Sequence, residues 1–248
     1  MKNENFYNAV SPFYDSMISF EKSLQKRKAF YTTVFAQKNI KTVADLGCGS
    51  GLDSLALAGI GLEVCGFDPS AEMIKLANQN AGKVKAEINF YRKGILEIPE
   101  KFTNKFDCAV SFGNTLANLN QNDLELAFQK IFRLLKPHGF FLLQILNYSR
   151  IKKQKETVIG FTDKEDSFIV RFNEFLKDEM NFHFLSVNKK MTSASSHYST
   201  KIYPHKQKFI SGLLQQAGFS NTRYYGNLAL EKFNTTNSKD LLIFTQKT

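Results

Sequence analysis

The sequence predicts an α/β fold in which a mostly parallel sheet carries helices on both faces and a smaller antiparallel insertion follows. Three observations indicate this fold. Short apolar runs alternate with helical patterns between residues 41 and 148. A glycine-rich turn follows the first of these runs, in the stretch VADLGCGSGLD at 43–53. After Tyr148 the chain becomes polar, lysine-rich and aromatic, with the alternation typical of antiparallel strands.

The predicted elements follow in order along the chain. Residues 1–40 are expected to be helical, because apolar side chains recur at intervals of three and four. The run GFFLLQILNY is apolar almost throughout, as expected for a central strand covered on both faces. The other elements before Tyr148 are strands within 42–47, 62–68, 86–94 and 106–114, and helices over 52–58, from 69 onward and over 123–135. After it we expect insertion strands, a helix at 209–217, and a closing hairpin of 223–230 and 240–247.

The chain is long enough for one full-sized core with a lid, since it has 248 residues of which 43% are hydrophobic. Its charged content of 23% is ordinary and argues against global disorder. We expect four segments: an N-terminal helical segment (1–40), the core (41–148), an insertion that forms a lid (149–203), and a C-terminal helix with the closing strands of the core (204–248).

Membrane and secretion signals are not expected from the sequence. No run approaches the roughly 18 uninterrupted apolar residues of a membrane span, and the first ten residues lack the apolar core of a secretory signal. The cysteines Cys48, Cys65 and Cys108 all lie in apolar runs, without a CxxC motif or a Cys/His cluster. We therefore expect reduced thiols, no metal site and a cytoplasmic protein.

The net charge of +10 permits an RNA or another anionic partner. The basic residues are dispersed, however, and their densest runs lie at 22–28 and 152–155. This distribution favours solvated helix faces and a loop over a nucleic-acid surface. We therefore do not expect nucleic acid as a partner.

The glycine-rich turn bears on the ligand, because ligands of parallel α/β sheets bind at the carboxyl ends of the strands. Dinucleotide loops space their glycines G-x-G-x-x-G, whereas this turn reads G-x-G-x-G. Asp45 lies two residues before the first glycine, which disfavours a pyrophosphate and suits a cationic ligand such as a sulfonium with an ammonium group. Asp68 ends the next strand, where a carboxylate can accept hydrogen bonds from a ribose diol.

The stretch VADLGCGSGLDSLALA followed by EVCGFDPSAEMIKLA resembles the class I S-adenosylmethionine (SAM)-dependent methyltransferases. The resemblance covers 41–148 and is favoured over an NAD(P) dehydrogenase. It implies an enzyme with a Rossmann-like seven-stranded sheet, with SAM as cofactor and S-adenosylhomocysteine as product. It also implies that the turn Gly47–Gly51 runs beneath the methionyl and ribose parts, that Asp68 holds the ribose hydroxyls, and that Pro69, Ser70 and Met73 flank the adenine.

The third cofactor segment departs from many relatives, which carry an aspartate just after the third strand. Ile95 occupies that position here. We expect the adenine to be held by the backbone near Gly94 and by Ile95 and Leu96, although these two can equally be core residues. Either Lys26 or Arg27 is expected to reach the SAM carboxylate. Tyr14 is expected to close over SAM, with helix packing as the alternative, and the further cofactor candidates are Cys48, Gly49, Asp53, Ser111, Phe112 and Gly113.

Three later segments resemble the glycine and sarcosine N-methyltransferases, in the same order. They are SFGNTLANL at 111–119, QILNYSRI at 144–151 and IYPH at 202–205. The resemblance implies a small-molecule amine as methyl acceptor. Two departures matter: Leu146 stands where those enzymes have an arginine for the substrate carboxylate, and Asn118 stands where they have a histidine. We therefore predict that glycine is not the acceptor.

The expected acceptor contacts are Asn114, Tyr203, Tyr148 and Arg171. Each has a structural alternative: loop capping for Asn114, core packing for the two tyrosines, and a surface charge for Arg171. The basic charge keeps an RNA or protein methyltransferase as an alternative function. The strand end FGNT, however, is not the Asn/Asp-Pro-Pro-aromatic loop that grips a flipped base. A second alternative is a SAM-binding protein without catalysis, and the oligomeric state is left open.

Overall fold

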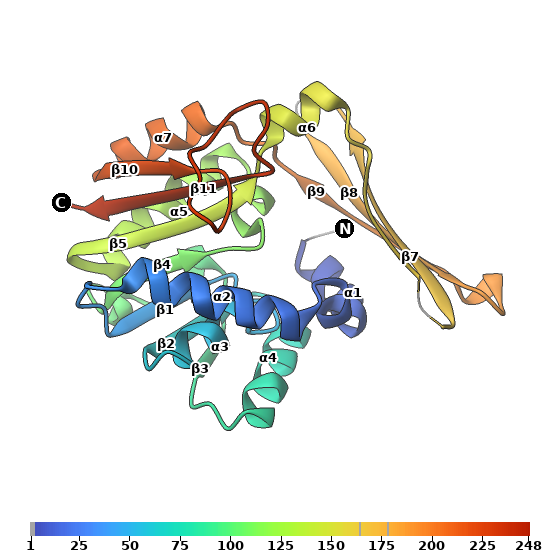
Figure 1. Ribbon diagram of the computed structural model, residues 1–248, viewed down its shortest axis with the longest axis horizontal. Coiled ribbons are helices and arrows are strands. Elements are labelled where there is room, and N and C mark those ends of the chain that lie inside the picture. Colours follow the sequence, from blue (N-terminus) through green and yellow to red (C-terminus); the bar gives the residue numbers. More distant parts are fainter. Residues whose placement is uncertain (1–2, 164, 178) are drawn as a thin grey trace.

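The computed structural model describes residues 3–163, 165–177 and 179–248, which form a seven-stranded main sheet in the order β10-β11-β5-β4-β1-β2-β3 (Figure 1). Strand β11 runs antiparallel to both of its neighbours, and the other strands run parallel to one another. The strands are β1 (Thr42–Leu46), β2 (Glu63–Asp68), β3 (Asn89–Arg92), β4 (Phe106–Ser111), β5 (Leu135–Leu146), β10 (Phe219–Tyr225) and β11 (Asp240–Lys247). The predicted α/β fold with a Rossmann-like sheet is confirmed.

Helices cover both faces of the main sheet. Helices α2 (Phe20–Phe35) and α3 (Leu52–Ala58) pack on one face, and α5 (Gln121–Leu134) and α7 (Gln207–Gln216) pack on the other. Helix α4 (Ala71–Lys83) follows β2 and contacts both β2 and β3. Strand β5 contributes Phe141 and Leu143 to one core and Leu142 to the other, which explains its nearly continuous apolar sequence.

A second antiparallel sheet, the insertion sheet, consists of β6 (Val158–Asp163), β7 (Ser167–Phe175), β8 (Met180–Asn188) and β9 (Ser196–Ile202). It extends away from the main sheet in Figure 1. Helix α1 (Asn3–Met17) packs on one of its faces, because Phe6 meets Phe182 and Phe13 meets Phe184 at ring-centroid distances of 5.7 and 5.4 Å. Helix α1 also contacts α4, so it joins the insertion sheet to the main domain.

Two segments differ from the predicted elements. Helix α6 (Tyr148–Gln154) follows β5, where insertion strands were expected, because Asn147 caps it and its residues Tyr148 and Ile151 are buried. Strand β10 ends at Tyr225, and residues 226–239 form a loop instead of extending the hairpin. Short 3-10 turns lie at η1 (Ile95–Glu97), η2 (Glu100–Phe102), η3 (Thr115–Asn118) and η4 (Thr192–Ala194). Among the described residues, no helix has the length and apolar character to cross a membrane.

Candidate active site

The glycine-rich turn folds back against β2 at the carboxyl end of β1. The amides of Gly47 and Cys48 both donate to the carbonyl of Phe67, at 2.7 and 3.0 Å. Gly47 has φ +78°, and a Cβ there would collide with the side chain of Thr115. Only glycine fits this position, because the turn must lie flat beneath the loop that follows β4.

Asp68 is fixed by backbone groups at the end of β2. Its Oδ2 accepts from the amide of Gly49 at 3.0 Å, and its Oδ1 accepts from the amide of Ser70 at 2.9 Å. Burial raises the pKa of Asp68 to about 6, although both hydrogen bonds oppose this shift. Each oxygen keeps a further lone pair, so the carboxylate can still accept hydrogen bonds from a ligand.

Three cavities lie along the carboxyl ends of the strands. Cavity A, of about 150 Å³, is bounded by α1 and the ends of β2 and β3; cavity B, of about 200 Å³, lies over the glycine turn beside α2; cavity C, of about 330 Å³, lies at the ends of β5 and β11. Tyr14 and Gly47 line both A and B, Arg27 and Leu228 line both B and C, and Gly113 lines all three. These shared residues make the cavities neighbours.

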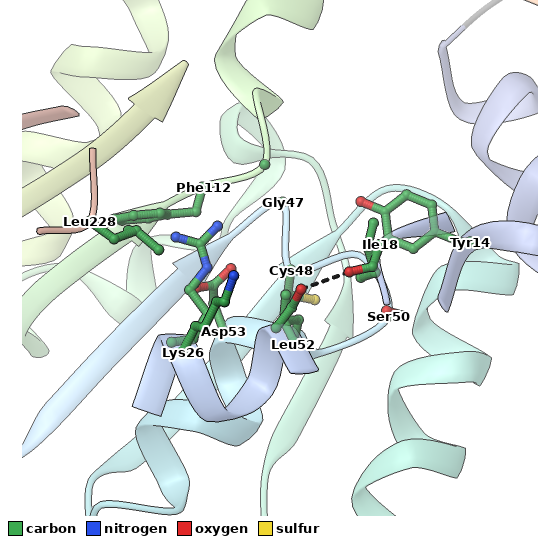
Figure 2. A pocket seen from close by; sticks show the side chains of 13 residues that line it. Tyr14, Ile18, Lys26, Gly47, Cys48, Ser50, Leu52, Asp53, Phe112 and Leu228 are labelled. Atoms are coloured by element: carbon green, nitrogen blue, oxygen red, sulfur yellow. Dashed lines mark hydrogen bonds and ion pairs between the residues drawn. The ribbon is translucent and has the colours of Figure 1, made fainter. Parts of the chain in front are cut away.

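Figure 2 shows cavity B, with Tyr14 on one side, Phe112 and Leu228 on the other, and the turn that begins at Gly47 between them. The predicted cofactor residues that line cavity B are Tyr14, Gly47, Cys48, Asp53, Phe112 and Gly113. Those that line cavity A include Gly49, Asp68, Pro69, Gly94 and Ile95. The structure therefore brings segments from four strand ends around two neighbouring cavities.

Five predicted cofactor residues do not line these cavities. Met73 is buried among α1 and insertion-sheet residues, and Leu96 is exposed. The Ser111 hydroxyl donates to the carbonyl of Leu46 at 2.9 Å, which holds β4 against β1. Gly51, with φ +87°, is the residue at which the turn passes into α3. The fifth residue is Asp45.

Asp45 lies behind the turn and is only 1% exposed. Its Oδ2 accepts a hydrogen bond from the Ser54 hydroxyl at 2.6 Å. Burial and the neighbouring Asp53 raise the pKa of Asp45 to about 8. The protein therefore favours the protonated form of this carboxyl group more than water does, and Asp45 does not line the cavities.

Arg27 of α2 lies where cavities B and C meet. Its Nε is 3.2 Å from Asp53 Oδ1, and its guanidinium lies over the Phe112 ring at 4.6 Å from the centroid. The Tyr31 hydroxyl donates to the same Asp53 oxygen at 2.7 Å. Within the described part of the chain, Arg27 Nη1 is buried without a hydrogen-bond partner, so it is suited to an anionic oxygen of a ligand. The Ser50 hydroxyl in cavity B has no partner there either.

The residues expected to contact the acceptor separate into two groups. Asn114 lines cavity C, and its Nδ2 donates to the Tyr148 hydroxyl at 2.7 Å while its Oδ1 accepts from the amide of Leu146 at 3.0 Å. Burial raises the pKa of Tyr148, so its phenol stays neutral. Tyr148, Tyr203 and Arg171 do not line the three cavities, and Tyr148 reaches cavity C only through its hydrogen bond with Asn114. The Tyr203 amide donates to a carbonyl of η3, and the Arg171 side chain covers Gly160 in the insertion sheet.

Sequence reasoning missed several polar residues of the site. Gln144 Oε1 accepts from the amides of Gly113 and Asn114 at 2.9 and 3.2 Å, and its Nε2 donates to Asp240 Oδ1 at 2.7 Å. The only signal in the sequence was a polar residue in each of two apolar strands. Other missed polar residues that line the cavities include Tyr7, Ser50 and Thr115.

Comparison with known proteins identifies the family. A methyltransferase domain model matches residues 43–139. A glycine/sarcosine N-methyltransferase from Aphanothece halophytica is 22% identical over 215 residues, covering 86% of this chain and 79% of that protein. The fold of a SAM-dependent methyltransferase from Clostridium acetobutylicum superimposes with a TM-score of 0.81 at 16% identity, covering 97% of this chain and 98% of that one.

A SAM-bound amino pentose methyltransferase from Micromonospora echinaspora has the same fold, with a TM-score of 0.69 at 14% identity and coverage of 95% of this chain and 97% of that one. Cavities A and B lie at the strand ends beside the glycine turn, which is part of the matched domain. The motif, the matched domain, the relative and the fold agree, and this chain belongs to the class I SAM-dependent methyltransferases, enzymes that use SAM as their cofactor.

Proposed function

We propose that this enzyme methylates a nitrogen of a small-molecule amine, and that glycine is not its acceptor. The observation that carries this proposal is cavity C, which adjoins the glycine-turn cavity and has a volume of about 330 Å³, enough for a small molecule. Leu146 lines cavity C. By the resemblance described above, the glycine enzymes carry an arginine at this position. Without that arginine, cavity C offers a substrate carboxylate no bidentate partner from β5.

The proposed cofactor site consists of cavities A and B. Asp68, fixed by two backbone amides, is suited to the ribose diol, and Ile95 and Pro69 to the adenine in cavity A. The unpartnered Nη1 of Arg27 in cavity B is suited to the methionyl carboxylate, and this contact also explains why Arg27 is held by Asp53. The buried polar atoms without partners thus fit SAM. When bound, SAM supplies an electrophilic methyl group on a sulfonium.

The residues of this chain supply positioning and the exclusion of water, which can account for most of the rate of a methyl transfer. The nucleophilic amine must be neutral and aligned. Asn114 is suited to orient it, because the Leu146 amide and the Tyr148 hydroxyl fix the Asn114 side chain. Tyr148 can share a hydrogen bond but does not act as a base at neutral pH, because burial raises its pKa. Gly113, which borders all three cavities, leaves room for the reacting groups.

The test uses purified enzyme, methyl-labelled SAM and a cell extract divided into small-molecule, RNA and protein fractions. We expect label in the small-molecule fraction and none on added glycine. Label in RNA or protein would instead support the second candidate function, which rests on the net charge of +10. Binding of SAM without label in any fraction would support the non-catalytic alternative.

A further inference from the structure

Asp240, at the start of β11, is a carboxylate of cavity C that the proposed function has not used. It pairs in register with Leu146 of β5, and Leu242 pairs with Gln144. Side chains paired in this way, and two residues apart, lie on one face of a sheet. All four line cavity C, and Asp240 is half-buried.

We infer that Asp240 binds the methyl acceptor, and that the acceptor is an amine that arrives as an ammonium cation and has no carboxylate near the reacting nitrogen, such as an amino sugar or a diamine. The reacting nitrogen gives up a proton to solvent before its lone pair accepts the methyl group. This inference rests on the proposed function, since it assumes that cavity C holds the acceptor. It adds the residue that recognises the acceptor and the charge that the acceptor carries.

The carboxylate of Asp240 is held in place by the protein. Its Oδ1 accepts from Gln144 Nε2 at 2.7 Å, and the same glutamine binds the amides of Gly113 and Asn114. The loop before Asp240 is also anchored. Asn147 Nδ2 donates to the carbonyls of residues 235 and 238 at 2.9 Å, and the Asn147 amide donates to the carbonyl of residue 239 at 3.0 Å. Asp240 is therefore oriented before a ligand arrives, which lowers the entropic cost of binding.

The charge of Asp240 is not balanced by an ion pair. Among the described residues, no basic side chain lies within 4 Å of its carboxylate, and its Oδ2 accepts no hydrogen bond. Arg27 borders the same cavity, but its guanidinium is paired with Asp53 and, in the proposed function, with the cofactor. Burial raises the pKa of Asp240. The hydrogen bond from Gln144 and the more distant charges of Arg27, Lys239 and Arg150 oppose that shift.

A half-buried carboxylate that makes no ion pair within 4 Å in the described part of the chain favours a cationic ligand and disfavours a second carboxylate. Cavity C is also lined by the apolar side chains of Leu146, Leu228 and Leu242 and by the polar side chains of Arg27, Asn114 and Gln144. Because Arg27 is paired with Asp53, the Asp240 carboxylate beside the three leucines is suited to an organic ammonium group. Gln144 acts as a positioning residue, because it links Asp240 to the Gly113 turn that borders the cofactor cavities.

The test uses the small-molecule fraction of the extract as the acceptor source, with methyl-labelled SAM. The fraction is first passed over cation- and anion-exchange resins at pH 7. We expect the acceptor activity to be retained by the cation exchanger. Asp240→Asn, which keeps the shape of the side chain, should lower labelling at least ten-fold while changing the Kd for S-adenosylhomocysteine less than two-fold. Glu125→Gln, on the exposed side of α5, is the matched control and should match the wild type.

Leu146→Arg is a second variant, because it places a cation opposite Asp240 and should suppress labelling to a similar degree. Acceptor activity that passes through the cation exchanger would overturn the inference, as would full labelling by Asp240→Asn. Failure of the proposed function is distinguishable, because the wild type would then label RNA or protein, or nothing, before any variant is compared.

Discussion

Asp53 holds the guanidinium of Arg27 in place, and Arg27 Nη1 is buried with no hydrogen-bond partner in the described part of the chain. A buried donor of this kind is suited to a hydrogen bond with a ligand. We expect Arg27→Gln to weaken SAM binding about 10- to 100-fold, since hydrogen bonds between charged groups contribute roughly 1.5–3 kcal/mol. Isothermal titration with SAM measures this. Lys26→Gln, the exposed neighbour that also lines cavity B, is the matched control and should change the Kd less than two-fold. If Lys26→Gln weakened SAM binding more than Arg27→Gln did, the contact with the SAM carboxylate would belong to Lys26.

A second substitution, at Asn114, tests the part of the site that we propose binds the acceptor. Asn114→Ala removes the acceptor for the Leu146 amide and the partner of the Tyr148 hydroxyl. We expect turnover to fall about 100-fold, because positioning of the nucleophile supplies much of the rate. The SAM affinity should change less than two-fold, because Asn114 lines cavity C and not the cofactor cavities. Loss of both turnover and SAM affinity would mean that Asn114 stabilises the loop after β4 and does not act only on the acceptor.

Local motifs made part of the site predictable. The Gly47 turn and Asp68 were recognisable because their partners lie on adjacent strands of one β-α-β unit. Arg27 could not be chosen over Lys26, because the choice depends on how α2 is rotated over the sheet. The pairing of Gln144 with Asp240 joins residues 96 positions apart in sequence, and no local pattern encodes such a contact.

Among the elements, α1 has a double role. It contributes Tyr7 and Tyr14 to cavity A, and it packs its phenylalanines on the insertion sheet. The sequence predicted α1 from its periodicity, and it predicted antiparallel strands after residue 149. It did not predict that the two would pack together, because α6 and its Asn147 cap determine where the insertion leaves the main sheet. The insertion sheet therefore supports the cofactor cavity through α1.

Phe184 tests this support, because it is fully buried between the insertion sheet and α1. We expect Phe184→Ala to destabilise the protein by about 3–5 kcal/mol, the usual cost of such a core truncation. SAM binding should weaken as well, because α1 carries Tyr14. Thermal unfolding and titration with SAM measure the two effects. Phe161→Ala, 61% exposed on the same sheet, should alter neither. A destabilised variant with unchanged SAM affinity would separate α1 from the cofactor site.

At the scale of the whole molecule, the carboxyl ends of the main sheet gather several buried acids in one place. Asp45 and Asp68 have raised pKa values, of about 8 and about 6, against about 3.9 for an unfolded aspartate. The folded state therefore holds more protons than the unfolded state in this range. The contribution of these two groups to the free energy of unfolding is greatest below pH 4, and it is lost as the pH rises toward 8.

The prediction concerns the ligand-free protein between pH 6 and 8. The melting temperature should fall as the pH rises, because the folded protein keeps a proton on the buried Asp45 that the unfolded chain has already released. Asp45→Asn keeps an oxygen for the Ser54 hydroxyl but cannot ionise, so its melting temperature should fall less steeply. Differential scanning fluorimetry in matched buffers measures both slopes, with Glu125→Gln as the control. Parallel curves for the wild type and Asp45→Asn would contradict the assignment.

Gly113 borders all three cavities, and its amide is bound to Gln144, which in turn holds Asp240. One peptide group is thus in contact with every compartment of the enzyme. In a ¹⁵N-labelled sample, the Gly113 amide is a built-in spectroscopic reporter. Its resonance should move once when S-adenosylhomocysteine enters and again when an amine is added. A single peak would then report whether the cofactor cavities and the acceptor cavity are occupied.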